Sequence, residues 1–283
     1  MNWRKFEERF FIVMMQTASL LILASFLAIM CTVLYYGLPA LNWEMITCAP
    51  KGGFYLGKEG GVANAIVGTF YLACGATALA LIVGIPVTLA LNVFLKRGSK
   101  LAIFIRFSFD VLWGVPSIVY GAFGFSLMLY MGMRASLLWG IITVALVILP
   151  AMCRAIDEVM QMIPSELQDA SLSVGANKCE TAFKVFVRQA LPGIVTATLI
   201  SFGRAAGDAA AVLFTAGFTD SVPKSLMEPA ATLPLAIFFQ LGTPFPEVQQ
   251  RAYASALILT ALILFVSIAA RLAGSRLSRF VIK

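Results

Sequence analysis

Six long apolar runs leave this chain few folds to adopt. A helix of about 20 apolar residues crosses the hydrocarbon core of a bilayer, and a helix satisfies its own backbone polar groups there. Only 12% of the 283 residues are charged, about half the share found in soluble domains. The sequence therefore predicts an all-α, polytopic membrane protein with six transmembrane helices, at about 11–36, 62–95, 101–133, 135–153, 194–217 and 252–273.

Two of these runs are longer than one bilayer thickness. The second contains Pro86 and the third contains Pro116. Because a proline inside a helix kinks it, we expect a bend at each of them. The first run is too long for the apolar core of a signal peptide and no good cleavage site follows it, which indicates a retained anchor.

Basic residues gather at alternate ends of the runs. When the runs are threaded in order, fifteen bases fall on one side of the membrane and five on the other, with Arg204 left inside a run. Cytoplasmic loops carry the excess of Lys and Arg. The pattern predicts cytoplasmic N- and C-termini and a cytoplasmic loop at 154–193, and it accounts for the net charge of +7 without a nucleic-acid partner.

Several kinds of site are excluded by what the sequence lacks. It has no histidine, and its five cysteines are far apart without a C-x-x-C pair, so neither a metal centre nor a disulfide framework is expected. Residues 52–59, G-G-F-Y-L-G-K-E, approach a phosphate-binding loop. There, however, Glu59 follows Lys58 where the metal-binding Ser or Thr would stand. We therefore expect no cofactor and no ATP on this chain.

Residues 154–193 form the longest polar stretch. The tripeptide Pro-Ser-Glu at 164–166 is typical of a helix start with Ser165 as the N-cap, and Gly175 marks a break. A second helical run, from residue 178 to 189, is closed by the Pro-Gly pair at 192–193. The pattern predicts two short helices joined by a glycine corner, forming a compact dock on one membrane face.

The two long segments on the other face are 38–61 and 218–250. The second contains five prolines and the apolar stretch 233–241. That stretch is either a re-entrant or surface-lying helix or part of a plain loop with some helix, and the sequence leaves both open.

Charged residues inside the fifth run are costly to place in lipid. Arg204 and Asp208 are four residues apart, hence on one helical face and able to pair. Each costs about 2.5–3.5 kcal/mol at a helix centre. Gly203 and Gly207 form a G-x-x-x-G step, which lets another helix approach closely. Two interpretations stay open: a buried ion pair that fixes packing, or an arginine that meets an anionic solute while Asp208 holds its side chain.

The third run repeats this spacing with Arg106 and Asp110. Pro116 frees a backbone carbonyl, and Ser117 is a candidate to satisfy it or to line a path. Roles in anchoring and in a solute pathway are equally supported here.

The polar loop then suggests a family. Residues 169–175, D-A-S-L-S-V-G, resemble the E-A-A-x-x-x-G signature of the membrane subunits of bacterial ABC importers, with Asp169 in place of the glutamate. The I-x-L-P that follows in the family is absent at its usual place, although Leu191-Pro192 comes shortly after. The resemblance implies the type I importer permease fold, with a coupling loop that docks on an ATPase through Glu166, Asp169, Ala170 and Gly175.

Three further segments, 60–69, 106–121 and 203–217, resemble the A-type permeases of phosphate-specific importers. Where that group usually has R-x-x-G-E-T-A, this chain has Asp208 and Ala209. The resemblance implies a non-enzymatic permease of the bacterial inner membrane. Its partners would be a second homologous permease, two ATPase subunits that bind ATP–Mg, an extracytoplasmic phosphate-binding protein and membrane lipid.

On this interpretation residues 1–61 hold the N-terminal tail, first helix and outer loop. Residues 62–273 are the permease core, with the coupling loop at 154–193, and 274–283 are a cytoplasmic tail. Arg204, Asp208, Arg106, Asp110 and Ser117 are the predicted pathway residues. The alternatives are a permease for sulfate or molybdate, a regulatory component that senses phosphate, and an anion channel independent of ATP.

Overall fold

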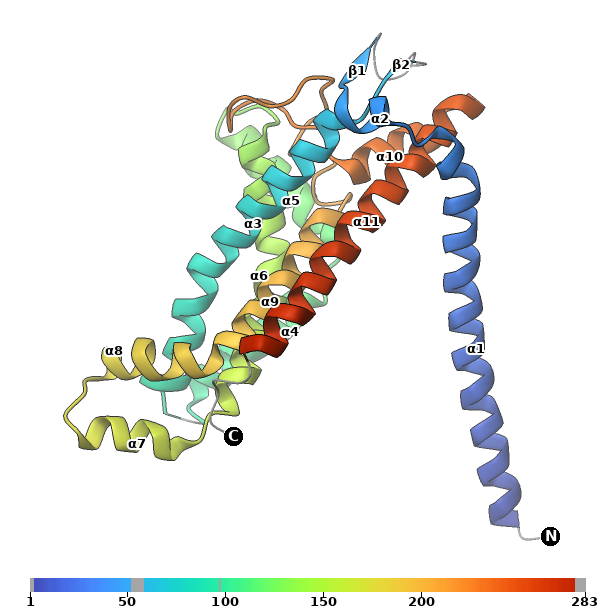
Figure 1. The fold of residues 1–283 in the computed structure, drawn as a ribbon. Coiled ribbons are helices and arrows are strands. Elements are labelled where there is room, and N and C mark those ends of the chain that lie inside the picture. The colour runs from blue at the N-terminus through green and yellow to red at the C-terminus, as the bar shows by residue number, and fades with distance from the viewer. Residues whose placement is uncertain (1–2, 52–58, 97, 278–283) are drawn as a thin grey trace.

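The computed structural model describes residues 3–51, 59–96 and 98–277, so the loop resembling a phosphate-binding site lies almost wholly outside the described residues. It is a helical bundle with one two-residue antiparallel strand pair (Figure 1). Its elements are α1 (Trp3–Gly37), η1 (Leu38–Ala40), α2 (Trp43–Thr47), β1 (Pro50–Lys51), β2 (Glu59–Gly60), α3 (Ala63–Leu89), η2 (Ala90–Phe94), α4 (Lys100–Trp113), α5 (Ser117–Tyr130), α6 (Leu137–Gln161), α7 (Ser165–Ser173), α8 (Lys178–Glu180), η3 (Thr181–Phe186), α9 (Val187–Gly207), α10 (Leu233–Leu241) and α11 (Pro246–Leu277).

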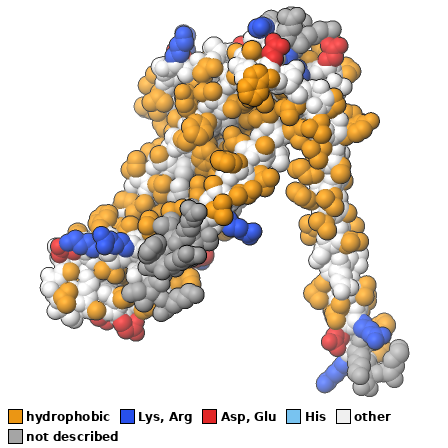
Figure 2. Space-filling model, in the orientation of Figure 1, with side chains coloured by type: hydrophobic (Ala, Val, Ile, Leu, Met, Phe, Trp, Pro, Cys, Tyr) orange, Lys and Arg blue, Asp and Glu red, His pale blue; other side chains and the backbone are white. Residues whose placement is uncertain are grey.

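The membrane-spanning character is confirmed. Within the described ranges, five helices are long and apolar enough to cross a bilayer, and the bent pair α4–α5 makes up to six. Hydrophobic side chains cover the shafts of α1 and the bundle, while Lys, Arg, Asp and Glu gather toward the two ends (Figure 2). That distribution matches an apolar slab between two aqueous faces.

The core lies between α3, α6 and α9. Small residues of α3, such as Ala73 and Ala76, share one buried cluster with Val144, Ile148 and Met152 of α6. Since small side chains let helix backbones approach closely, α3 and α6 form the most extensive helix pair of the bundle. This pair is the platform on which α4, α5 and α9 pack.

The third predicted span is broken rather than kinked. The axes of α4 and α5 differ by 97° across the break at Gly114–Pro116. Pro116 has no N–H to give to Leu112, four residues earlier, and the hydroxyl of Tyr120 donates to the Leu112 carbonyl at 2.9 Å. Tyr120, and not the predicted Ser117, is therefore the side chain that satisfies the freed carbonyl.

The polar loop differs from its prediction at both ends. α7 begins where expected, but Pro164 occupies the N-cap position and Ser165 is the first helical residue, so the predicted Ser165 cap is wrong. Pro192 and Gly193 do not end the second helix, which runs unbroken from Lys178 to Gly207. A proline in a helix interior costs about 3 kcal/mol, and the buried stripe of Ala182, Phe186, Ala190 and Ile194 continues across it into the core.

Gly175 forms the predicted corner. Its φ of +88° lies in the left-handed region that glycine adopts without steric cost. After the corner Asn177 begins α8 with a capping box, accepting from the Glu180 N–H at 2.9 Å while the Glu180 side chain accepts from the Asn177 N–H at 3.1 Å.

The outer segment 218–250 contains a helix. The apolar stretch 233–241 forms α10, with Leu233, Leu235 and Ala236 buried, and it packs against α11 and α3. The N–H of Leu233 donates to the hydroxyl of Thr69 at 2.8 Å. The stretch 233–241 is therefore helical, within a segment whose preceding part, 218–232, has no regular secondary structure.

α1 stands apart from the rest of the bundle (Figure 1). It meets α11 near its end, where Gly37 faces the backbone of Tyr253, and its apolar side chains are otherwise largely exposed. The start of α1, the end of α11 and the α7–α8 arm lie at the same end of the molecule.

Candidate functional site

A cavity of about 250 Å³ lies between α6 and α9, beside the end of α4. The two helices run in opposite directions, and Gly193 of α9 fixes their register by lying against Val159 of α6. A Cβ on Gly193 would stand 2.5 Å from the Val159 methyl carbons, so a larger residue fits only if Val159 or one of the helices moves. The cavity lining consists of Trp113, Ala151, Arg154, Ala155, Glu158, Ala197, Ile200, Ser201 and Arg204.

Arg204 and Arg154 are successive cations along this cavity. Counting from the Val159–Gly193 contact, Arg204 is eleven residues along α9 and Arg154 five residues back along α6. At 1.5 Å per residue, their Cα atoms are offset by roughly 9 Å along the helix axes. The offset places Arg154 nearer to α7 than Arg204.

Arg204 is exposed on α9 and makes no ion pair within the described residues. The predicted pairing with Asp208 is wrong, because α9 ends at Gly207 and Asp208 has an extended backbone. The Asp208 carboxylate accepts from the N–H of Ala211 at 2.8 Å and so shapes the turn that follows α9. Arg204 is left facing the cavity with its charge uncompensated.

Arg154 is held between two carboxylates. Its Nε lies 3.4 Å from Asp110 Oδ1 and 3.2 Å from Glu158 Oε1, and both acids are at least half exposed. Asp110 therefore pairs with Arg154 of α6 and not with Arg106, one turn back on its own helix. The sequence marked Asp110 as a pathway residue but treated Arg154 only as one base of the polar loop.

Arg106 belongs to a different, buried network. Its Nε donates to Asp157 Oδ2 at 2.8 Å and its Nη2 to Asp157 Oδ1 at 3.0 Å. Asn92 of η2 and Gln161 also donate to the same carboxylate, at 2.7 Å and 2.6 Å. Asp157 is completely buried. The network joins η2, α4 and α6 just before α7, and Arg106 is not a cavity residue.

Two other sequence predictions do not reach the cavity. Ser117 is the first residue of α5 and is absent from the lining. Gly203 and Gly207 face the side chain of Ile263 on α11 at ordinary contact distances, so their step does not mark a tight backbone approach. Among the glycines of α9, the close contact is at Gly193.

The α7 arm presents an uncovered surface. No residue of α7 is buried, and Glu166, Asp169 and Ala170 are all exposed. At the corner Val174 is 85% exposed, and no heavy atom lies within 4 Å of where a Cβ on Gly175 would stand. Both acids and the apolar tip are therefore free to contact another protein.

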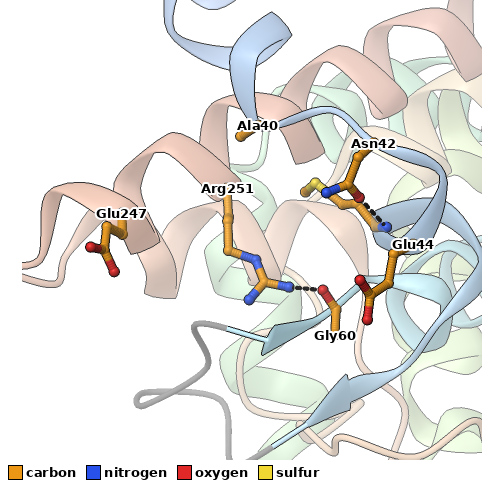
Figure 3. Close-up of a pocket in the computed structure, with 7 residues that line it drawn as sticks. Ala40, Asn42, Glu44, Gly60, Glu247 and Arg251 are labelled. Carbon is orange, nitrogen blue, oxygen red and sulfur yellow. Dashed lines mark hydrogen bonds between the residues drawn. The ribbon is translucent and has the colours of Figure 1, made fainter.

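A second, larger cavity of about 450 Å³ lies at the opposite end of the bundle. Figure 3 shows Arg251 of α11 pointing to the carbonyl of Gly60, to which it donates a hydrogen bond. Asn42 accepts from the N–H of Met45 at 2.7 Å and caps α2 beside it. Arg251 thus ties β2 to α11. The sequence counted this arginine only as one of the five bases on its side.

Comparison with known proteins identifies the family of this chain. The family described as binding-protein-dependent transport system inner membrane component matches residues 80–279. The phosphate transport system permease protein PstA of Xylella fastidiosa is 31% identical over 244 residues, which are 85% of this chain and 83% of that protein. PstA of Haemophilus influenzae is 28% identical over 273 residues, 95% of this chain and 94% of that protein.

Among solved structures, a chain of a bacterial alginate ABC transporter, crystallised with its alginate-bound periplasmic protein, superimposes with a TM-score of 0.66. The match covers 99% of both chains at 11% identity, which establishes the fold alone. The chain therefore belongs to the family of binding-protein-dependent transport system inner membrane components, as a relative of the PstA permease proteins.

Proposed function

We propose that this chain is a membrane-spanning permease subunit of an ATP-driven phosphate importer, and that it moves the anion without changing it chemically. The observation that carries the proposal is the cavity along which Arg204 and Arg154 follow one another, in a relative of PstA proteins. A guanidinium stays charged at any physiological pH, and its fork of N–H donors matches phosphate oxygens.

Arg204 is the first cation that the solute meets and Arg154 the second. Arg204 has no carboxylate partner in the described residues, so it is free to bind an anion. Arg154 is shared with Asp110 and Glu158, which compete with the solute and keep its binding weak. Weak, successive sites let an ion enter and then leave.

A second homologous permease completes the cavity in this proposal. Arg204 is exposed on a single chain, and an arginine facing lipid is costly. A partner that packs over this face, within the permease core of residues 62–273, would remove that cost and enclose the path. An extracytoplasmic phosphate-binding protein would deliver the anion at the end opposite α7.

The proposal places ATP hydrolysis on two partner ATPase subunits that bind ATP–Mg, and gives this chain no catalytic role. The α7 arm, with Glu166, Asp169, Ala170 and the Gly175 corner, is the surface that contacts them. The protein lies in the bacterial inner membrane with the arm and both termini in the cytoplasm. The common position of the arm, the start of α1 and the end of α11 supports that orientation.

Uptake into proteoliposomes tests this function. The complete assembly is reconstituted with binding protein outside and ATP inside, and labelled phosphate and sulfate are offered side by side. We expect ATP-dependent phosphate uptake that Arg204→Gln abolishes while the subunits still copurify. Arg134→Gln, which removes an exposed arginine between α5 and α6, is the matched control and keeps full uptake.

Uptake that survives Arg204→Gln would make Arg204 a packing residue and place the path elsewhere. Uptake of sulfate or molybdate without phosphate would assign a different oxyanion. An intact assembly that moves no anion but alters the phosphate response of the cell would assign a regulatory role.

A further inference from the structure

The helix that follows the Gly175 corner has two contrasting faces. Ala182, Phe186 and Ala190 are fully buried in the core. The opposite face comprises Phe183, Lys184, Arg188 and Leu191, and is called here the basic face. These four residues stand at i, i+1, i+5 and i+8 of a continuous helix, which places them on one side of it. Val187, between them, is half-buried against the core.

The basic face is open, and it mixes apolar and cationic side chains. Phe183 is 60% exposed and Leu191 is 39% exposed. Lys184 and Arg188 are exposed as well. Lys184 donates to Glu180 Oε1 at 3.1 Å, but an ammonium has three donors, and two remain for other partners.

This face is not the side covered by α7. The hydroxyls of Ser171 on α7 and Thr181 on η3 lie 3.0 Å apart, so α7 packs on the other side of the helix. In Figure 2 a row of Lys and Arg side chains runs along the edge of the arm over α8 and η3, on the side toward the apolar shaft of the bundle. The arm joins the bundle where that apolar shaft ends.

We infer that the basic face binds the headgroups of anionic phospholipids and seats the arm on the membrane surface. An exposed phenylalanine and leucine beside lysine and arginine are typical of a helix at the bilayer interface. The apolar side chains enter the acyl boundary, and the cations meet the phosphate groups. Free phosphate would make no favourable contact with the apolar side chains of Phe183 and Leu191. The proposed ATPase contact lies on the α7 side of the arm.

This inference needs only a membrane-spanning chain, and it does not depend on which solute is carried. It adds a lipid contact to the arm that the proposed ATPase contact does not supply. The face next to the bilayer and the face next to the ATPase are separate sides of one hairpin.

Lipid binding to the purified full-length protein tests the inference. The protein is exchanged into mixed phosphatidylglycerol and phosphatidylcholine, and the ratio of the two lipids retained per protein is measured by mass spectrometry at low and high salt. One basic residue near an anionic surface contributes about fivefold in affinity, so Lys184→Gln with Arg188→Gln should lower the preference for phosphatidylglycerol about 25-fold.

Three controls test whether the lipid preference comes from this face. Arg134→Gln with Lys224→Gln removes the same charge at the other end of the bundle and should leave the preference unchanged. Phe183→Ala should weaken retention of both lipids alike. Excess inorganic phosphate should displace no lipid. The inference is overturned if Lys184→Gln with Arg188→Gln keeps the preference, if the distant pair lowers it as much, or if phosphate displaces the lipid.

Discussion

Arg106 of α4 forms its two-point ion pair with Asp157 of α6, 51 residues away, and not with Asp110 one turn along its own helix. The Asp157 carboxylate is completely inaccessible to solvent and accepts four hydrogen bonds within the described residues. A buried carboxylate whose partners are all present is stable, whereas one that loses its cation is not. The pair therefore holds the base of α6, where the arm begins, against α4.

Replacing Asp157 with Asn should destabilise the protein strongly. It leaves the Arg106 guanidinium, whose side chain is 19% exposed, without its fully buried counter-charge, and breaking a buried pair typically costs about 3–5 kcal/mol. Thermal unfolding in detergent measures the effect. Glu158→Gln, which removes one exposed partner of Arg154, should cost about 0–1 kcal/mol. The double variant Arg106→Gln, Asp157→Asn should recover part of the loss, and equal losses for Asp157→Asn and Glu158→Gln would contradict the assignment.

Replacing Gly193 with Ala should disturb the packing of α6 on α9. The new methyl group would lie 2.5 Å from both Val159 methyl carbons, and overpacking of this kind costs about 1–3 kcal/mol. Gly207→Ala is the control, since its nearest neighbour would be 3.7 Å away. We expect lower thermal stability for Gly193→Ala alone, restored by adding Val159→Ala. A larger loss at Gly207 would favour the G-x-x-x-G step as the tight contact.

Substitutions at Gly175 should show whether the backbone conformation or a clash with neighbouring atoms requires glycine there. Its φ is +88° and no atom lies within 4 Å of a Cβ added there, so the penalty is conformational. Asn adopts the left-handed region more readily than a β-branched residue does. ATP-driven uptake should therefore be kept better by Gly175→Asn than by Gly175→Val, with the assembly intact in both. Equal loss would mean that the ATPase requires a bare backbone at the corner.

Removing a carboxylate partner of Arg154 should strengthen anion binding at the inner end of the cavity. Glu158→Gln or Asp110→Asn leaves the guanidinium with one competitor instead of two. We expect a lower KM for phosphate together with a lower kcat, because a tighter site releases the ion more slowly. Glu7→Gln, an exposed acid on α1, should change neither constant. A raised KM in Glu158→Gln would exclude Arg154 as a solute contact.

Much of the fold follows from the sequence because a backbone that crosses lipid must satisfy its own polar groups, which favours helices. Apolar runs of spanning length become helices, and Gly175 turns the chain as its position indicates. The pairing of the charges does not follow in the same way. Helical spacing put Arg106 next to Asp110 and Arg204 next to Asp208, but spacing describes a single helix.

The actual partners come from packing between helices and from where each helix ends. In the sequence Asp157 is one of several acids in a polar stretch, and only the packing of α6 on α4 brings it to Arg106. Asp208 does not pair with Arg204 because α9 ends at Gly207, one residue before Asp208. No local pattern carries either fact. Only Arg154, adjacent to the cysteine that closes the fourth run, gave a signal that could have been used, since it is a charge at the edge of an apolar segment.

The passage of α9 through Pro192 without a break has a mechanical consequence. Arg188 of the basic face and Arg204 of the cavity lining are sixteen residues apart on one helix, roughly 24 Å at 1.5 Å per residue. A continuous helix resists bending far more than a loop would, so it behaves as a lever. A tilt of about 5° about the end at Arg188 would carry Arg204 sideways by about 2 Å over that length, which is comparable with the reach of a hydrogen bond.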